Sequence, residues 1–84
     1  MSTLIQLRNR PTFINAASVT SIRVVKDALE PSNGIIEVVD HVGRSHEFSG
    51  SMKWDVADDL CTAFAEAVAL GENKVIRVSG LLLN

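Results

Sequence analysis

The hydrophobic pattern of the chain is strongest between residues 51 and 71, where it has the period of an α-helix. At about 100° per residue, the apolar side chains there fill one continuous half of a helical wheel: Val56, Ala67, Leu60, Phe64, Ala57, Val68, Cys61, Trp54 and Ala65. Ser51 is a good N-cap residue, and Gly71 stands where a left-handed residue would end a helix. We therefore predict an amphipathic helix over residues 52–70. Its large apolar side chains would form the centre of the core: Trp54, Leu60, Phe64 and Val68.

Several shorter segments alternate apolar and polar residues, which is the period-two pattern of half-buried strands. They cover residues 3–8, 12–14, 19–26, 35–41, 44–49 and 74–79. Breaks rich in proline, asparagine or glycine separate most of them, and Asn15 can cap a single turn before the third segment. The element order is therefore β-β-β-β-β-α-β. It predicts an α+β fold, a small antiparallel sheet of about five to six strands with the long helix packed on one face.

Length, cysteine content and hydropathy bound the class of protein. At 84 residues the chain is a single domain, 1–84, near the lower size limit for folding without covalent or metal staples. Its one cysteine excludes an intramolecular disulfide and suits a reducing compartment. No segment approaches the ~20 apolar residues of a membrane span, and the N-terminus has no signal-peptide pattern. We expect a soluble, cytoplasmic protein without a membrane partner.

Residues that could carry enzymatic or metal chemistry are sparse. His41 and His46 flank a predicted hairpin tip at residues 42–43, but a metal site needs three or four converging ligands and no third is evident. Cys61 lies on the apolar side of the predicted helix, the usual place for an unreactive thiol. The sequence has no glycine-rich phosphate loop, G-x-S-x-G elbow or base–nucleophile pair. We expect no enzymatic activity, catalytic residue, cofactor or metal.

The polar side of the predicted helix is acidic. It carries Asp55, Asp58, Asp59 and Glu66 with no basic residue between them. A solvated surface is the simpler interpretation, because exposed charge runs usually need no partner. The alternative is a docking face for a basic surface of another protein. Such a row of carboxylates could imitate nucleic-acid phosphates, as small inhibitors encoded by phages or mobile elements often do, and so occupy a basic site on a host or phage enzyme.

Basic residues are spread along the predicted strands. Arg23 and Arg77 point to the polar sides of their strands, so one sheet face could carry a modest positive stripe together with Lys26. Platforms for single-stranded nucleic acid add exposed aromatic side chains on which bases stack, and this chain has few of them. A net charge of −2 also argues mildly against general phosphate binding. A nucleic-acid-binding sheet is therefore the weaker alternative.

The chain ends in three adjacent leucines, Leu81, Leu82 and Leu83. If they extend the last strand, alternate side chains face opposite sides of the sheet, so at least one of them needs a cover. A second copy of the chain is the simplest cover. Together these patterns favour a non-enzymatic protein–protein interaction module that forms a homodimer through the leucines and has an unidentified protein as a further partner. The acidic inhibitor and the nucleic-acid-binding sheet are the alternatives.

Overall fold

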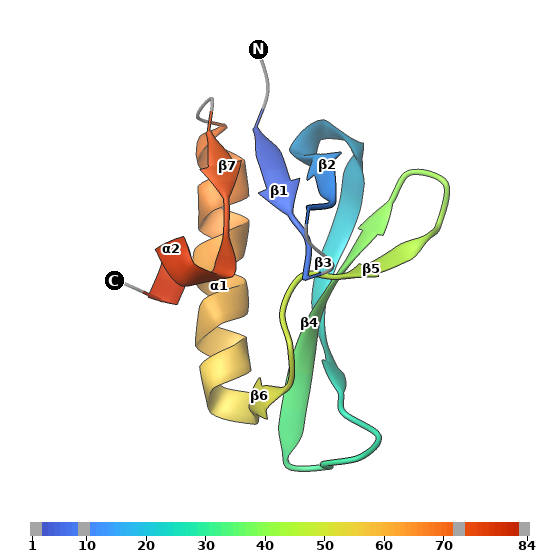
Figure 1. Cartoon of the computed structure of the whole chain (residues 1–84), viewed down its shortest axis with the longest axis vertical. Coiled ribbons are helices and arrows are strands. Elements are labelled where there is room, and N and C mark those ends of the chain that lie inside the picture. The colour runs from blue at the N-terminus through green and yellow to red at the C-terminus, as the bar shows by residue number, and fades with distance from the viewer. Residues whose placement is uncertain (1–2, 9–10, 72–73, 83–84) are drawn as a thin grey trace.

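A computed structural model of the chain describes residues 3–8, 11–71 and 74–82. Its elements are β1 (Leu4–Gln6), β2 (Phe13–Asn15), the 3-10 helix η1 (Ala16–Ser18), β3 (Val19–Lys26), β4 (Asn33–Asp40), β5 (Ser45–Glu47), β6 (Met52–Lys53), α1 (Trp54–Leu70), β7 (Val75–Ile76) and α2 (Val78–Leu82). The long helix α1 runs along one side of the strands (Figure 1). The predicted α+β class, with one long helix between the early strands and a last one, is confirmed.

The strands form two small sheets rather than one. The first has the order β2-β1-β7, and the second has the order β3-β4-β5 with β6 paired to the other end of β4. The pairing of β1 with β7 is parallel, whereas the sequence predicted only antiparallel strands. The two sheets are joined where the backbone N–H of Arg8 donates to the C=O of Glu47, with 3.0 Å between nitrogen and oxygen.

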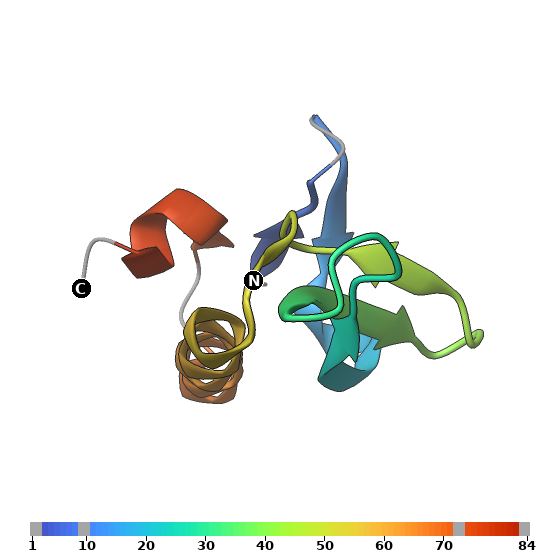
Figure 2. The same cartoon turned by 90° about the horizontal axis from the view of Figure 1, so that it is seen from below.

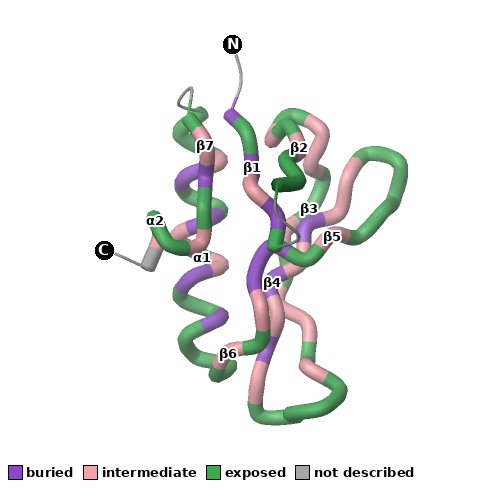
Figure 3. Tube along the Cα trace, viewed as in Figure 1, coloured by how far each residue is buried: buried purple, intermediate pink, exposed green. Residues whose placement is uncertain are grey.

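The core lies between α1 and the inner faces of both sheets (Figures 2 and 3). Its buried apolar side chains come from every layer: Ile5, Leu7, Ile36, Val38, Phe48, Leu60, Phe64, Ala67 and Ile76. The rings of Phe48 and Phe64 stack at its centre, with 4.0 Å between centroids and 11° between ring planes. Ser49, which follows Phe48 in the chain, is also buried. Its hydroxyl is satisfied, because it accepts a hydrogen bond from the N–H of Ile36 at 3.1 Å and donates to the C=O of Gly50.

The ends of α1 follow the sequence signals only in part. Gly71 has φ 65° and donates its N–H to the C=O of Val68, so the predicted left-handed end is confirmed. The start is different, because Ser51 does not cap the helix. Residues 52–53 pair with β4 as β6, and the hydroxyl of Ser51 instead accepts a hydrogen bond from the side-chain amide of Asn33 at 3.0 Å. Lys53 occupies the N-cap position and makes no side-chain cap.

The two sheets cover a narrower arc of α1 than the sequence predicted. Ala57, Leu60, Phe64 and Ala67 are buried, whereas Trp54 is 44 % exposed and Val56 is 43 % exposed. The latter two lie at opposite margins of the apolar half of the helix. The prediction that Trp54 belongs to the centre of the core is therefore wrong.

The predicted strand over residues 74–79 is wrong in its length. Only Val75 and Ile76 form a strand, and α2 follows from Val78, with the N–H of Leu81 donating to the C=O of Arg77 at 3.3 Å. The predicted cap at Asn15 is confirmed, because its side-chain oxygen accepts a hydrogen bond from the N–H of Ala17 at the start of η1. Among the residues described, no helix is long and apolar enough to cross a membrane.

Candidate functional site

The predicted acidic residues of α1 all lie on its solvent side. Asp55, Asp58, Asp59 and Glu66 are exposed and together form the acidic face of the helix. No ion pair involves any of them within the described part of the chain. Three carboxylates elsewhere each have a cationic or histidine partner: Glu37, Asp40 and Glu47. The acidic face therefore holds every charged residue of α1, and none of these carboxylates has an ion-pair partner among the described residues.

The basic residues proposed for nucleic-acid binding do not form one stripe. Arg23 lies on β3 of the second sheet, where its Nη2 is 2.6 Å from Oε1 of Glu37. Arg77 follows β7 of the first sheet, and its Nε donates to the side-chain oxygen of Gln6 at 3.0 Å. Lys26 is exposed at the end of β3. Arg23 belongs to the second sheet and Arg77 directly follows a strand of the first, so the predicted common face is wrong.

The histidines flank the β4–β5 hairpin as predicted. Nε2 of His46 is 3.0 Å from Oδ2 of Asp40, and the other oxygen of Asp40 accepts from the N–H groups of Val42 and Arg44. These hydrogen bonds, that of His46 first, lower the pKa of Asp40 to about 2. His41 is exposed, and no three metal-ligating side chains converge anywhere among the described residues.

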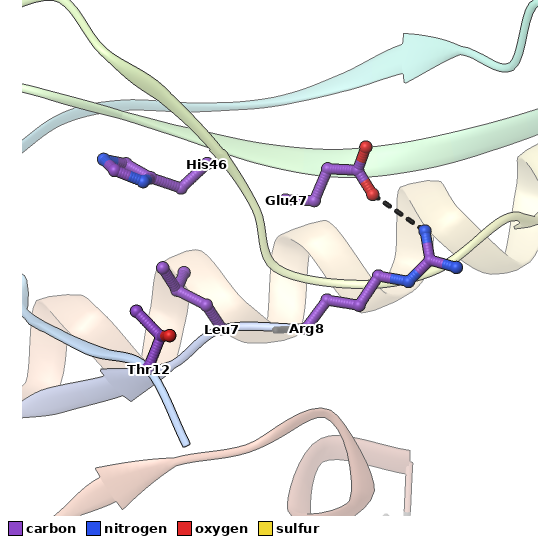
Figure 4. A pocket seen from close by; sticks show the side chains of 5 residues that line it. All are labelled: Leu7, Arg8, Thr12, His46 and Glu47. Atoms are coloured by element: carbon purple, nitrogen blue, oxygen red, sulfur yellow. Dashed lines mark hydrogen bonds and ion pairs between the residues drawn. The ribbon is translucent and has the colours of Figure 1, made fainter. Parts of the chain in front are cut away.

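A shallow cavity of about 470 Å³, which no sequence pattern predicted, lies where the end of β1 meets β5. Leu7, Arg8, Thr12, His46 and Glu47 line it (Figure 4). Nη1 of Arg8 is 2.8 Å from Oε1 of Glu47, so the two charges of the lining neutralise each other. The contact also fastens the two sheets together, which gives these residues a structural role.

The leucines proposed as a dimer interface lie in or after α2. Leu81 is half-buried and packs against the core, so it needs no second copy to cover it. Leu82 ends α2, but its side chain and the whole of Leu83 lie outside the described residues. Because residues 78–82 are helical, the alternation of side chains that motivated this interface does not apply.

A different surface combines exposed apolar side chains with a free strand edge. Trp54, Cys61 and Val68 stand seven residues apart along α1, so they share one side of the helix. Ile22 and Val24 lie on β3, and all of these side chains except the more exposed Trp54 are half-buried. We call these five residues the α1–β3 margin. The other flank of the buried side of α1, at Ala67, lies near β7 and α2. Figure 2 shows α1 and β3 along the same edge of the molecule.

Contacts at Gly34 show how closely helix and strand approach in the α1–β3 margin. A Cβ at Gly34 would lie 2.6 Å from Cγ1 of Val24 and 3.0 Å from Cε3 of Trp54. The indole ring therefore lies over the backbone of β4 beside Val24, in space that only glycine leaves open. The pKa of the Cys61 thiol, farther along the margin, is raised by burial and by the nearby Asp58 carboxylate, which disfavours a reactive thiolate.

The outer edge of β3 carries unpaired backbone groups. Within the part of the chain that the structure describes, β3 ends its sheet and no strand pairs with its outer side. Ile36 lies directly opposite Val24, and its N–H and C=O bond to Ser49 and Phe48 on the other side of β4. Val24 and Ile36 are therefore a non-hydrogen-bonded pair of the antiparallel ladder, in which the N–H and C=O groups of both residues point away from the partner strand. The N–H and C=O of Val24 therefore point to the free edge.

The same alternation fixes the direction of the neighbouring backbone groups. The N–H of Asp27 donates to the C=O of Asn33 at 3.1 Å, so odd-numbered residues at this end of β3 face β4. Ile22 and Lys26 consequently present their N–H and C=O outward together with Val24. The sequence did not reveal this site, because a strand pattern says which face a side chain takes but not which strand stands at the edge.

Comparison with known proteins gives no match for this chain, whether to a family model, to a curated protein or to a solved structure. Its function is therefore inferred from the surfaces described above.

Proposed function

We propose that the chain is a non-enzymatic protein–protein interaction module that works as a homodimer. The observation that supports this proposal is the α1–β3 margin, where a free strand edge runs beside half-exposed apolar side chains. An unpaired edge is a template for another strand, and covering apolar surface adds to the free energy of association. A second copy that adds its own β3 to the sheet would pair the free backbone groups and cover the apolar side chains at the same time.

The length and chemistry of β3 single it out among the edges of the two sheets. It has eight residues, whereas β2 and β5 have three and β7 has two. Monomeric proteins commonly protect long edges with proline, bulges or charges. In β3 the irregularity lies between Val19 and Ser21 and Lys26 is at the far end. The one charge in the middle of the strand, Arg23, forms an ion pair with Glu37 of the same chain, so it protects the edge only weakly.

Sedimentation equilibrium over about 10 µM to 1 mM tests the homodimer. We expect the apparent mass to rise from the monomer value of 9.1 kDa toward twice that value as concentration increases. Salt up to about 0.5 M should leave the association nearly unchanged, because it would depend on backbone hydrogen bonds and apolar contacts rather than on exposed charges. A mass that stays at the monomer value up to 1 mM would refute the homodimer.

The acidic face of α1 supports a second candidate function, docking to a basic surface of another protein. Its four carboxylates are exposed and lack an ion-pair partner among the described residues. Replacing Asp58 and Asp59 by asparagine should reduce the capture of a basic partner from a lysate and weaken its dependence on salt. The matched control is the double variant Asp27→Asn, Glu30→Gln, which removes two charges from the β3–β4 connection. Equal capture by both variants would leave the acidic face as a solvated surface.

A further inference from the structure

We propose that two copies pair antiparallel along β3 with Val24 at the two-fold axis. This inference rests on the homodimer proposed above and specifies its register. A two-fold axis perpendicular to the sheet places each strand residue opposite one on the same face, so one residue pairs with its own copy. Among the outward-facing residues of β3, Val24 and Ile22 are the two central candidates for that position.

The irregularity of β3 favours Val24 over Ile22. A register centred on Ile22 would pair Val24 with Thr20 of the second copy, and Thr20 lies where the ladder with β4 shifts. The hydroxyl of Thr20 also bonds to backbone carbonyls at the end of β4. A register centred on Val24 pairs Ile22 with Lys26 of the second copy and uses only the regular part of the strand. Its three hydrogen-bonded pairs would contribute about six backbone hydrogen bonds.

The charges on β3 are compatible with this register. Arg23 lies on the outer face of the sheet and would stand opposite Val25 of the second copy, while Lys26 would stand opposite an isoleucine. A register centred on Arg23 would instead place two guanidinium groups directly across from each other, which is unfavourable. The ion pair of Arg23 with Glu37 lies within the same chain and can persist in the dimer.

The axis at Val24 also gives the half-exposed tryptophan a partner. The ring of Trp54 lies beside Val24 on the inner face, so the two tryptophans of a dimer would approach each other next to the axis. Their burial would add apolar contact to the backbone pairing. Because the chain has one tryptophan, its fluorescence reports on this position alone.

The size of the interface predicts a weak dimer. The paired segment from Ile22 to Lys26 is about 17 Å long. Each copy contributes only β3 and the adjacent side of α1 to the interface. Such a contact is smaller than the about 800 Å² per partner of a standard interface. We therefore expect half-association at tens to hundreds of micromolar, and a shift of the Trp54 emission to shorter wavelength over the same concentration range.

Two opposite substitutions at Val25 test the register by sedimentation equilibrium. Val25 is half-buried on the outer face, where either a glutamate or a lysine side chain can reach solvent. In the proposed dimer each new side chain stands opposite Arg23 of the other copy. Val25→Glu should therefore tighten the dimer by roughly threefold or more, and Val25→Lys should weaken it by a similar factor. The control pair Ser45→Glu and Ser45→Lys, on exposed β5, should leave association unchanged.

The outcomes distinguish the register from the homodimer itself. Opposite shifts for the two Val25 variants, with urea unfolding confirming that both remain folded, support the axis at Val24. A wild-type dimer that responds to both variants in the same direction, or to neither, overturns the register and leaves the homodimer standing. A wild-type chain that stays monomeric up to 1 mM overturns both proposals.

Discussion

Shortening Phe64 tests whether α1 and the second sheet share one core. The side chain is 0 % exposed and stacks on Phe48, which is 1 % exposed and follows β5. Phe64→Ala should cost about 3–5 kcal/mol, the range for removing a buried phenylalanine. An 84-residue domain is expected to have a total stability of roughly 4–13 kcal/mol. The variant should therefore be close to unfolded or clearly less stable.

A milder variant keeps the measurement within range if Phe64→Ala does not fold. Phe64→Leu retains most of the apolar volume but loses the ring contact, so it should cost about 1–2 kcal/mol. A double-mutant cycle with Phe48→Leu should give a coupling of about 0.5–1.5 kcal/mol, the part specific to the aromatic pair. Asp59→Asn on the exposed side of α1 is the control and should change stability by less than about 0.5 kcal/mol.

Urea unfolding followed by circular dichroism measures all of these variants. The denaturation midpoint should fall in the order wild type, Phe64→Leu, Phe64→Ala, while the slope changes little. A midpoint for Phe64→Ala close to that of the wild type would show that this side chain is not at the centre of the core. Equal destabilisation by Asp59→Asn would show that the assignment of buried and exposed sides of α1 is wrong.

Two further predictions concern the margin and the hairpin. Gly34→Ala should lower stability by about 1–3 kcal/mol, since its Cβ would overlap Val24 and touch Trp54; an unchanged urea midpoint would contradict this packing. The pKa of Asp40 is about 2, below the ordinary 3.8, because His46 and two turn N–H groups bond to the carboxylate. Its ionised form therefore stabilises the fold above about pH 4, and this contribution is lost as pH falls from about 4 to about 2. In Asp40→Asn the urea midpoint should therefore change less between about pH 4 and about pH 2 than it does in the wild type. The same pH dependence in both proteins would contradict the lowered pKa of Asp40.

The sequence predicted the elements whose signals are local. The helical period around Phe64, the glycine that ends α1 and the cap at Asn15 each depend on residues close together in the chain. All three are present in the structure. The start of α1 was predicted wrongly because Met52 and Lys53 take part in the ladder with β4, and pairing with a distant strand overrides a capping preference.

Non-local pairing explains the larger differences. The parallel contact of β1 with β7 joins residues about seventy positions apart, and no local pattern encodes it. Because local patterns do not show which elements pack together, they also do not reveal the α1–β3 margin. A helical wheel gives the angle of Trp54 but not the width of the surface that covers the helix, so it predicts a core position for a side chain that is 44 % exposed. Helix α2 has five residues and is too short to show a helical period, so the sequence does not distinguish it from a continuation of the last strand.

Backbone hydrogen exchange at Val24, measured by NMR at about 20 µM and about 1 mM, tests the proposed interface most directly. In the monomer the N–H of Val24 points to the free edge of β3, so its amide should exchange fast at the lower concentration. The N–H of Arg23 bonds to β4 in every state and should exchange slowly at both concentrations. We predict that exchange at Val24 slows at the higher concentration in proportion to the dimer fraction found by sedimentation. Exchange at Val24 that does not depend on concentration, in samples that sediment as dimers, would contradict pairing through β3.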